Sequence, residues 1–226
     1  MPKDVKRDIY GELNYAPITL FAEKLNVGVI GAGRGALIKT RNYYNKGAHI
    51  EVLALDFLED FYKFDRNKVT LVKESYTTDF IRDKHIIIIA IDDEKLTNKI
   101  KIDCESQHKI YINSSNFKDG MGVVPVSRES KYVSVAVNTK LGNPRGAVMI
   151  ADSITEYIAE LDEYIELTSK VRNSITIEKN IKEGLLKFIN SRDCKYFYDK
   201  NKIISVLKLF YNDEIVNKIS FLGKEE

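Results

Sequence analysis

The stretch NVGVIGAGRGA, residues 26–36, decides how the first half of the chain folds. It opens with a short β-rich run that ends at Ile30, and a glycine-rich turn follows over residues 31–36. Residues 34–46 have a helical pattern, and Gly47 stands where a helix commonly ends in a left-handed residue. The turn fits the pattern G-x-G-x-x-[G/A], which is informative here because a predicted strand precedes it and a predicted helix follows it.

Each small residue of this turn has a physical reason. Gly31 permits a tight turn, and Gly33 has no Cβ, so a pyrophosphate can approach the backbone. Ala36 is small enough for the helix to pack closely on a sheet. The N–H groups at the start of the helix, at Arg34 and Gly35, can then bind the anion. The turn therefore predicts a dinucleotide site, and the alternative is a structural glycine turn that binds nothing.

A carboxylate follows the second predicted strand, residues 50–55. Asp56 lies about twenty residues beyond the turn, where an acid hydrogen-bonds the adenosine ribose and repels a 2′-phosphate. The sequence therefore predicts NAD as the cofactor, unless Asp56 is an ordinary loop acid. Leu55 is assigned to the same site, together with Ile91 and Asp92 at the end of a later strand.

The rest of the first half alternates strands and helices. Residues 68–73 alternate as a strand does, and residues 85–91 are apolar on both faces, which is typical of an interior parallel strand. Two acids begin a predicted helix over residues 92–107, where the helix dipole favours them, and residues 109–112 form a fifth strand. This repetition predicts a parallel α/β sheet.

The pattern changes after Asn113. Residues 122–127 and 132–138 are strand-like with no helix between them, which predicts a hairpin or an exchanged strand. Pro144 begins a region that is helical to the end of the sequence.

The composition excludes several classes of protein. Lys and Arg number 35 against 33 Asp and Glu, so the basic excess of a nucleic-acid binder is missing. Cys104 and Cys194 lie far apart and the three histidines are isolated, so we expect no metal site. The longest apolar run, residues 86–91, is far below the roughly 18 residues of a membrane span, and residues 1–10 are too charged for a signal peptide. We therefore expect a cytoplasmic protein that binds neither nucleic acid nor membranes.

Seven short segments occur in a recognisable order over residues 15–161. They are YAPI (15–18) with LF (20–21), the glycine turn, IAIDD (89–93), Leu96 with Asn98, Asn113, Pro125, and VAVNTKLGNP (135–144). In this order they resemble the precorrin-2 dehydrogenase/sirohydrochlorin ferrochelatase family, the NAD-binding module of siroheme synthases.

The resemblance implies a Rossmann-type parallel sheet, then a short β dimerisation region, then a C-terminal α-helical domain. The expected bounds are residues 1–113, 114–145 and 146–226. It also implies a homodimer that oxidises precorrin-2, a polycarboxylate tetrapyrrole, to sirohydrochlorin with NAD⁺ in siroheme or cobalamin biosynthesis. Some members then insert iron themselves, and others leave metal insertion to a separate pathway enzyme.

The sequence departs from the family at a proton-moving carboxylate. The family segment Asn-Val-Val-Asp corresponds to residues 113–116, Asn-Ser-Ser-Asn, so the carboxylate position falls on Asn116. An amide has no proton to exchange near neutral pH and cannot act as a general base. Asp119 is an alternative carboxylate, and Thr139 keeps a hydroxyl at a family serine position. Asn116, Asp119 and Thr139 are therefore the candidate catalytic residues.

A polycarboxylate substrate calls for cationic side chains near the cleft. Arg128, Lys140 and Arg145 are the candidates, beside Arg34, and the alternative for each is an ordinary surface base. Lys140 stands at a family glycine and would repel an incoming metal dication, so we expect ferrochelatase activity to be weak or absent.

Two functions remain open. The first is NAD-dependent oxidation of precorrin-2, because hydride transfer depends mostly on positioning by the fold and cofactor. The second is a non-catalytic NAD- or tetrapyrrole-binding dimer that acts as a regulator, a carrier or a partner of a pathway enzyme, and Asn116 favours it. A Rossmann regulatory domain of another kind and a different dehydrogenase are further alternatives.

Overall fold

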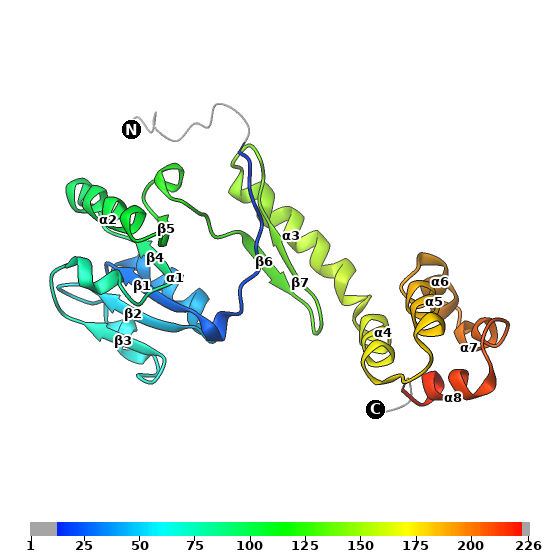
Figure 1. The fold of residues 1–226 in the computed structure, drawn as a ribbon. Coiled ribbons are helices and arrows are strands. Elements are labelled where there is room, and N and C mark those ends of the chain that lie inside the picture. Colours follow the sequence, from blue (N-terminus) through cyan, green and yellow to red (C-terminus); the bar gives the residue numbers. More distant parts are fainter. Residues whose placement is uncertain (1–12, 223–226) are drawn as a thin grey trace. The chain divides into compact units, whose positions relative to one another are not determined.

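A computed structural model describes residues 13–222 of the chain (Figure 1). The chain divides into two compact units, and each is described by itself. One unit comprises residues 15–124, and the other comprises Pro125 onward together with Leu13 and Asn14. The charged residues 1–10, which are not expected to form a signal peptide, lie outside the described residues.

The first unit is built on a sheet of five parallel strands in the order β3-β2-β1-β4-β5. The strands are β1 (Asn26–Ile30), β2 (His49–Leu53), β3 (Val69–Val72), β4 (Ile86–Ile89) and β5 (Ile110–Asn113). The chain reverses its direction of travel across the sheet between β3 and β4. In such sheets a ligand binds beyond the carboxyl ends of the strands, where the strand order switches.

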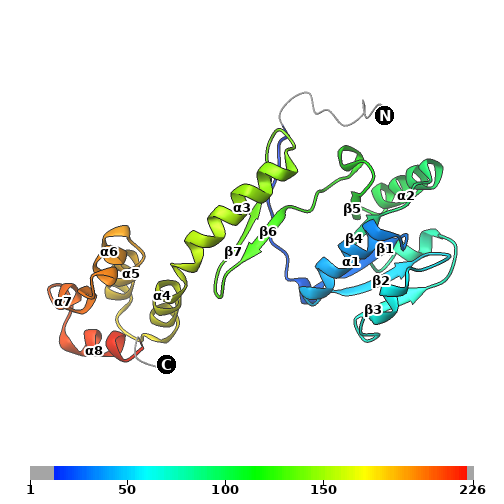
Figure 2. The same ribbon diagram turned by 180° about the vertical axis from the view of Figure 1, so that it is seen from behind.

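Two α-helices and four short 3₁₀ helices complete this unit. They are α1 (Arg34–Asn45), α2 (Glu94–Ser106), η1 (Ala22–Lys24), η2 (Glu59–Lys63), η3 (Thr78–Ile81) and η4 (Phe117–Asp119). Helix α1 lies in front of the strands in Figure 2, the view from behind. It ends as its sequence predicts, because Gly47 adopts a φ of +89°.

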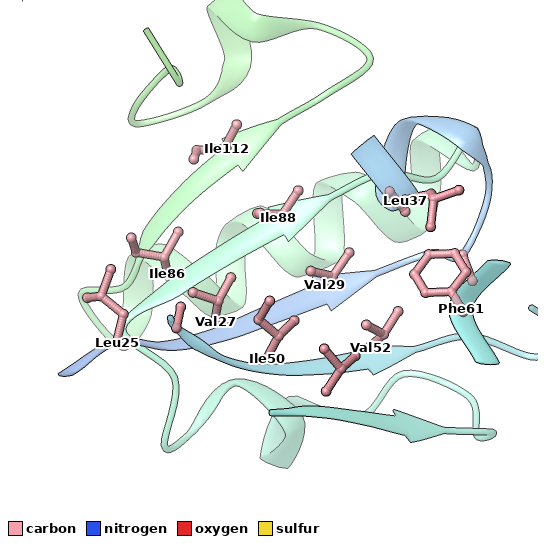
Figure 3. Packing of buried hydrophobic residues seen from close by; sticks show 14 residues of the cluster. Leu25, Val27, Val29, Leu37, Ile50, Val52, Phe61, Ile86, Ile88 and Ile112 are labelled. Carbon is pink, nitrogen blue, oxygen red and sulfur yellow. The ribbon is translucent and has the colours of Figure 1, made fainter. Parts of the chain in front are cut away.

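Both faces of the sheet are buried. Val27, Val29, Ile86 and Ile88 pack on one side with residues of α1 and with Phe61 (Figure 3). On the other side, the alternate strand residues Ile30, Ile87 and Ile89 pack with η3 and α2, which contribute Ile81, Ile100 and Cys104. The sequence of β4 is therefore apolar throughout because both faces of this strand are covered, as predicted for an interior parallel strand.

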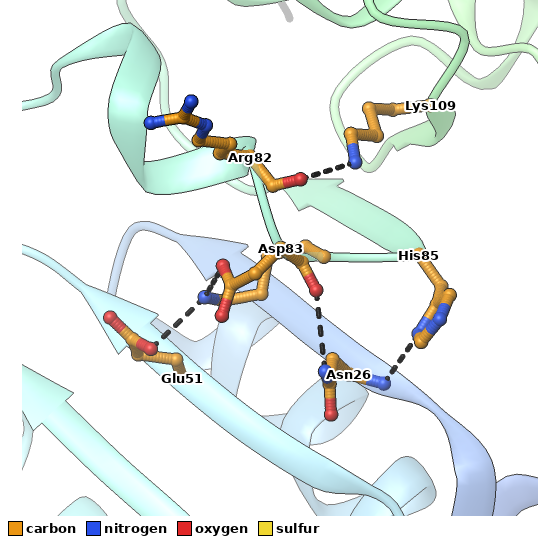
Figure 4. Close-up of polar contacts among 7 residues, drawn as sticks. Asn26, Glu51, Arg82, Asp83, His85 and Lys109 are labelled. Carbon is orange, nitrogen blue, oxygen red and sulfur yellow. Dashed lines mark hydrogen bonds and ion pairs between the residues drawn. The ribbon is translucent and has the colours of Figure 1, made fainter.

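A polar network closes the amino edge of the sheet, away from the glycine turn (Figure 4). The Asn26 N–H donates to His85 Nδ1 at 2.9 Å, and the His85 N–H donates to the Asn26 carbonyl at 2.8 Å. The Lys84 side chain is only 5% exposed, and its ammonium pairs with Glu51 at 3.0 Å and with Asp83. These two carboxylates balance the charge of the Lys84 ammonium, which would be costly to bury without them.

The second unit joins a hairpin to a set of helices. Strands β6 (Val126–Glu129) and β7 (Ser134–Val137) pair antiparallel, as the hairpin prediction requires, and α3 (Pro144–Ala159) packs against both. The other helices are α4 (Asp162–Ser174), α5 (Lys179–Ile189), α6 (Arg192–Asp199), α7 (Ile203–Leu207) and α8 (Asp213–Leu222). They enclose a core of their own, which includes Val171, Leu185, Cys194, Leu207 and Val216.

One carboxylate ties the hairpin to these helices. Asp162, at the start of α4, accepts hydrogen bonds from the Ser130 hydroxyl at 2.7 Å and from the N–H groups of Lys131 and Tyr132 at 2.9 and 3.0 Å. Desolvation opposes the charge on Asp162, but these bonds and the Lys131 ammonium outweigh it, so the pKa of this carboxyl lies below its usual value. The hairpin turn is therefore fixed on α4.

The two units do not follow the predicted domain bounds at residues 113 and 145. The Gly122 N–H donates to the Tyr111 carbonyl at 3.1 Å, and Val124 packs against the sheet core, so the segment after β5 folds back onto the first unit. At the other end, the Leu13 N–H donates to the Lys140 carbonyl at 2.7 Å, which joins the start of the described chain to the second unit. A dimerisation role for residues 114–145 stays a prediction. None of the helices within residues 13–222 is long and apolar enough to cross a membrane.

Candidate active site

The glycine turn lies at the carboxyl end of β1, between this strand and α1. Gly31 has a φ of +107°, and its N–H donates to the Leu53 carbonyl at 2.8 Å. A Cβ at this position would lie 2.2 Å from the Ala90 carbonyl oxygen. Gly31 is therefore required by the backbone itself, whether or not a ligand binds.

Gly33 and Gly35 are different, because no contact among residues 13–222 requires them to be glycine. Gly33 has a φ of −81°, which any residue adopts, and a Cβ at Gly33 or Gly35 would meet no heavy atom within 4 Å. Both residues are exposed, whereas Ala36 is fully buried against the sheet. The open space above Gly33 is room that a ligand can use.

The first turn of α1 fits an anion in that space. Gly33 offers no side chain to cap the helix, and the first turn contains no acid. The first N–H groups of a helix have no intrahelical partner and carry the positive end of its dipole. Arg34, which makes no ion pair with any described residue, adds a positive charge at the same end. These groups match the pyrophosphate of a dinucleotide.

The loop after β2 lies against the glycine turn. The Leu58 N–H approaches the Ala32 carbonyl at 3.5 Å, which holds the loop beside the turn. Asp56 is exposed three residues beyond the end of β2, and within residues 13–222 its carboxylate makes no hydrogen bond or ion pair. Leu55 is 66% exposed beside it. An exposed carboxylate and an apolar side chain are the groups that an adenosine ribose and its base require.

The end of β4 forms the other wall of the turn. Ile91 Cγ2 lies 3.0 Å from the point that a Cβ on Gly31 would occupy, so Ile91 packs directly on the turn. Asp92 is exposed next to it. Asp93 has a structural task, because its Oδ1 accepts the Leu96 N–H at 3.0 Å and caps α2.

A second tight turn follows β5 at the same edge of the sheet. The side chain of Asn113 is buried, and its Oδ1 accepts the N–H groups of Ser115 and Asn116 at 3.0 and 3.1 Å. The Ser115 hydroxyl donates to the Ile91 carbonyl at 3.1 Å. The turn after β5 is therefore attached to the same residue that packs on the glycine turn.

Two of the predicted catalytic residues meet in this second turn. Asn116 Nδ2 donates to Asp119 Oδ2 at 2.7 Å, and the Asp119 N–H donates to the Asn116 carbonyl at 3.0 Å. From the sequence the two residues were expected as alternatives, and in the structure they are joined as a donor and an acceptor. The hydrogen bonds of Asn113 and Ser115 were not predicted from the sequence. The signal was present, because in Asn-Ser-Ser-Asn an asparagine side chain commonly accepts the backbone N–H two residues on.

The remaining predicted residues belong to the second unit. The Thr139 hydroxyl accepts the Asn143 N–H at 2.6 Å and supports the turn before α3. Arg128 is paired with Asp152, with 2.7 Å between Nε and Oδ1. Arg145 is exposed in the first turn of α3, and Lys140 is exposed before it. Their roles toward a substrate stay predictions.

Comparison with known proteins bears on the first unit most directly. Residues 18–126 match a family model described as "Putative NAD(P)-binding". The match covers a little under half of the chain and coincides with the first unit. The glycine turn, Asp56 and the Asn113–Asp119 turn all lie within it, so a nucleotide cofactor is supported, although the match does not separate NAD from NADP.

The fold of the chain is similar to that of SirC, precorrin-2 dehydrogenase. The similarity has a TM-score of 0.68 at 17% sequence identity and covers 92% of this chain and 100% of that chain. The predicted fold class is thereby confirmed. A D-lactate dehydrogenase from Sporolactobacillus sp. is 17% identical over 42% of this chain and 28% of its own, with a TM-score of 0.34 that is too low to support an argument. No curated protein matches the sequence significantly.

Proposed function

We propose that this protein is an NAD-dependent dehydrogenase that oxidises precorrin-2 to sirohydrochlorin, with weak or absent ferrochelatase activity. The observation that carries the proposal is the meeting of two turns at one edge of the sheet. The open glycine turn offers an anion site, and the Asn116–Asp119 pair offers a carboxylate. Ile91 contacts both turns, since it packs on Gly31 and accepts the Ser115 hydroxyl.

The reaction removes a hydride and a proton from the substrate. Bound NAD⁺ supplies the two-electron acceptor at this site. The N–H groups at the start of α1 bind the pyrophosphate, and Asp56 accepts hydrogen bonds from the adenosine ribose. Because a 2′-phosphate would face the Asp56 carboxylate, we propose NAD rather than NADP as the cofactor.

Asp119 is the proposed proton acceptor. The amide of Asn116 cannot take a proton, but it donates to Asp119 Oδ2 at 2.7 Å and thereby fixes the orientation of that carboxylate. With Asn116 as the donor and Asp119 as the base, dehydrogenation does not require an acid at position 116.

The proposed substrate-binding residues keep the assignment that the family resemblance implies. Arg145 and Lys140 are exposed cations that suit a polycarboxylate tetrapyrrole. Arg128 lies in β6 of the hairpin, and Thr139 lies with Lys140 in the turn between β7 and α3. Whether the product enters siroheme or cobalamin synthesis depends on enzymes that act after this one. A cytoplasmic location is part of the proposal.

A homodimer is also part of the proposal. Helix α3 buries Ala147, Ala151 and Ile158, whereas its Met149 and Tyr157 side chains are 66% and 62% exposed. Exposed large apolar side chains on one helix are a candidate interface. Sedimentation of the purified protein should give twice the monomer mass at micromolar concentration, and a monomer there would contradict the dimer.

The second candidate function is a non-catalytic NAD- or tetrapyrrole-binding protein. Asn116 at the family carboxylate position and the pairing of Arg128 with Asp152 favour it. Anaerobic incubation with precorrin-2 and NAD⁺ separates the two functions. The dehydrogenase should yield one NADH for each sirohydrochlorin formed, and added Fe²⁺ should give little siroheme. Tight binding of sirohydrochlorin without NADH formation would favour the carrier.

A further inference from the structure

One buried amide controls the geometry of the turn that carries Asp119. Asn113 ends β5, where it aligns with Ile89, and it is only 4% exposed. Its single Oδ1 accepts two backbone N–H groups, those of Ser115 and Asn116. A side chain that accepts two successive N–H groups fixes the backbone that follows, and here that backbone carries Asn116.

The path from Asn113 to the carboxylate is continuous. The N–H of Asn116 is held by Asn113, its side chain donates to Asp119 Oδ2, and its carbonyl accepts the Asp119 N–H. A second attachment holds the same turn, because the Ser115 hydroxyl donates to the Ile91 carbonyl. Gly120 closes it from the other side, since a Cβ there would lie 3.0 Å from the Asn113 nitrogen.

We infer that Asn113 is the positioning residue of the active site. Its buried carboxamide oxygen fixes the Asn116–Asp119 pair and thereby holds the Asp119 carboxylate at the carboxyl ends of the strands, where the coenzyme is proposed to bind. The inference rests on the proposed function, in which Asp119 takes the proton. Asn113 does not touch the substrate; it acts through Asn116. The chemistry it requires is an acceptor with two lone pairs at the end of β5, which aspartate also supplies and alanine does not.

Two substitutions at this residue separate positioning from folding. Asn113→Ala leaves two N–H groups without their acceptor, and Asn113→Asp keeps both hydrogen bonds while adding a charge near Asp119. A positioned base contributes about 10²–10⁴-fold, so Asn113→Ala should lower kcat at least about tenfold, with the KM for NAD⁺ within about twofold of the native value. Asn113→Asp should restore most of kcat, because its carboxylate oxygen can accept the same two N–H groups.

The control is Asn212→Ala. Asn212 also accepts a backbone N–H through Oδ1, that of Ile215 at 3.0 Å at the start of α8, and it lies in the second unit. Its substitution should leave kcat unchanged. Equal loss of kcat in the two alanine variants, or failure of Asn113→Asp to restore it, would overturn the positioning role.

Two further measurements distinguish this inference from the proposed function. Asp119→Asn should abolish turnover; if it does not, the assignment of the base fails and the positioning role fails with it. If Asp119→Asn abolishes turnover and Asn113→Ala does not, the proposed function stands and only the inference falls. If the native protein does not turn over, amide exchange over residues 115–119 still decides whether Asn113 holds the turn: faster exchange in Asn113→Ala than in Asn113→Asp supports it, and equal exchange refutes it.

Discussion

Substitution of Gly33 by alanine separates a glycine kept for a ligand from one kept for the fold. The added Cβ meets no protein atom within 4 Å, and the φ of −81° suits alanine. Alanine is a poorer helix cap than glycine, but it also reduces the freedom of the unfolded chain, so the free energy of unfolding should change by less than about 1 kcal/mol. Gly31→Ala should instead prevent folding, because its Cβ would lie 2.2 Å from the Ala90 oxygen at a φ of +107°.

The effect of Gly33→Ala on coenzyme affinity should be much larger than its effect on stability. A methyl group in the open space displaces the pyrophosphate from the N–H groups of α1. A hydrogen bond to a charged group contributes about 1.5–3 kcal/mol, so the loss of one such bond alone, about 2 kcal/mol, weakens binding about 30-fold.

The assay for Gly33→Ala is a titration of NAD⁺ and NADH by calorimetry or fluorescence, alongside urea unfolding. Gly184→Ala is the matched control: it adds the same methyl group in α5, where the nearest atom to the new Cβ is the Tyr211 hydroxyl at 4.0 Å. The control should raise stability by about 0.5–1 kcal/mol and leave coenzyme affinity unchanged. Unaltered coenzyme affinity in Gly33→Ala would refute the assignment of the open space to the pyrophosphate.

Three further predictions concern single features of the first unit. Asp56→Asn should reduce the preference for NAD over NADP by about tenfold in binding titrations, because the charge that repels a 2′-phosphate is lost; an unchanged ratio would mean that the acid points elsewhere. Thr40 is fully buried on α1, and its hydroxyl has no hydrogen-bond partner within residues 13–222, so Thr40→Val should stabilise the fold by about 1 kcal/mol, and a lower Tm would show that the hydroxyl is satisfied. The double change Glu51→Gln with Asp83→Asn leaves the buried Lys84 ammonium unpaired and should lower the free energy of unfolding by about 3 kcal/mol or more. Lys84→Met should lower it by less, as measured by urea unfolding. The reverse order would contradict the role given to the two carboxylates.

The sequence was sufficient for the sheet because local patterns there agree with the final packing. The four isoleucines of β4 are all buried, two against each face, which is what an apolar run on both faces predicts. Asp93 caps α2 as an acid at a helix start is expected to do. Gly31 and Gly47 both adopt the positive φ that their places in a turn and after a helix predict.

Less of the candidate site could be predicted from the sequence, because its geometry depends on side-chain hydrogen bonds that follow no periodic pattern along the chain. Asn116 suggested a lost carboxylate, and only the 2.7 Å contact with Asp119 reveals the pair. The extension of the first unit past residue 113 has a similar cause. Residues 114–124 carry no strong periodicity. They join the first unit because Gly120 allows the backbone to approach β5 closely and the Gly122 N–H donates to the Tyr111 carbonyl.

Whether a nicotinamide coenzyme binds at the carboxyl edge of the sheet is tested most directly by amide hydrogen exchange with and without NADH. Binding should slow exchange over residues 31–37, 54–58 and 91–93, because the glycine turn, the Asp56 loop and the end of β4 would then be covered. Exchange at the amino edge, near Asn26 and His85, should not change. Protection at the amino edge alone, or none at saturating NADH, would contradict the coenzyme site and the dehydrogenase built on it.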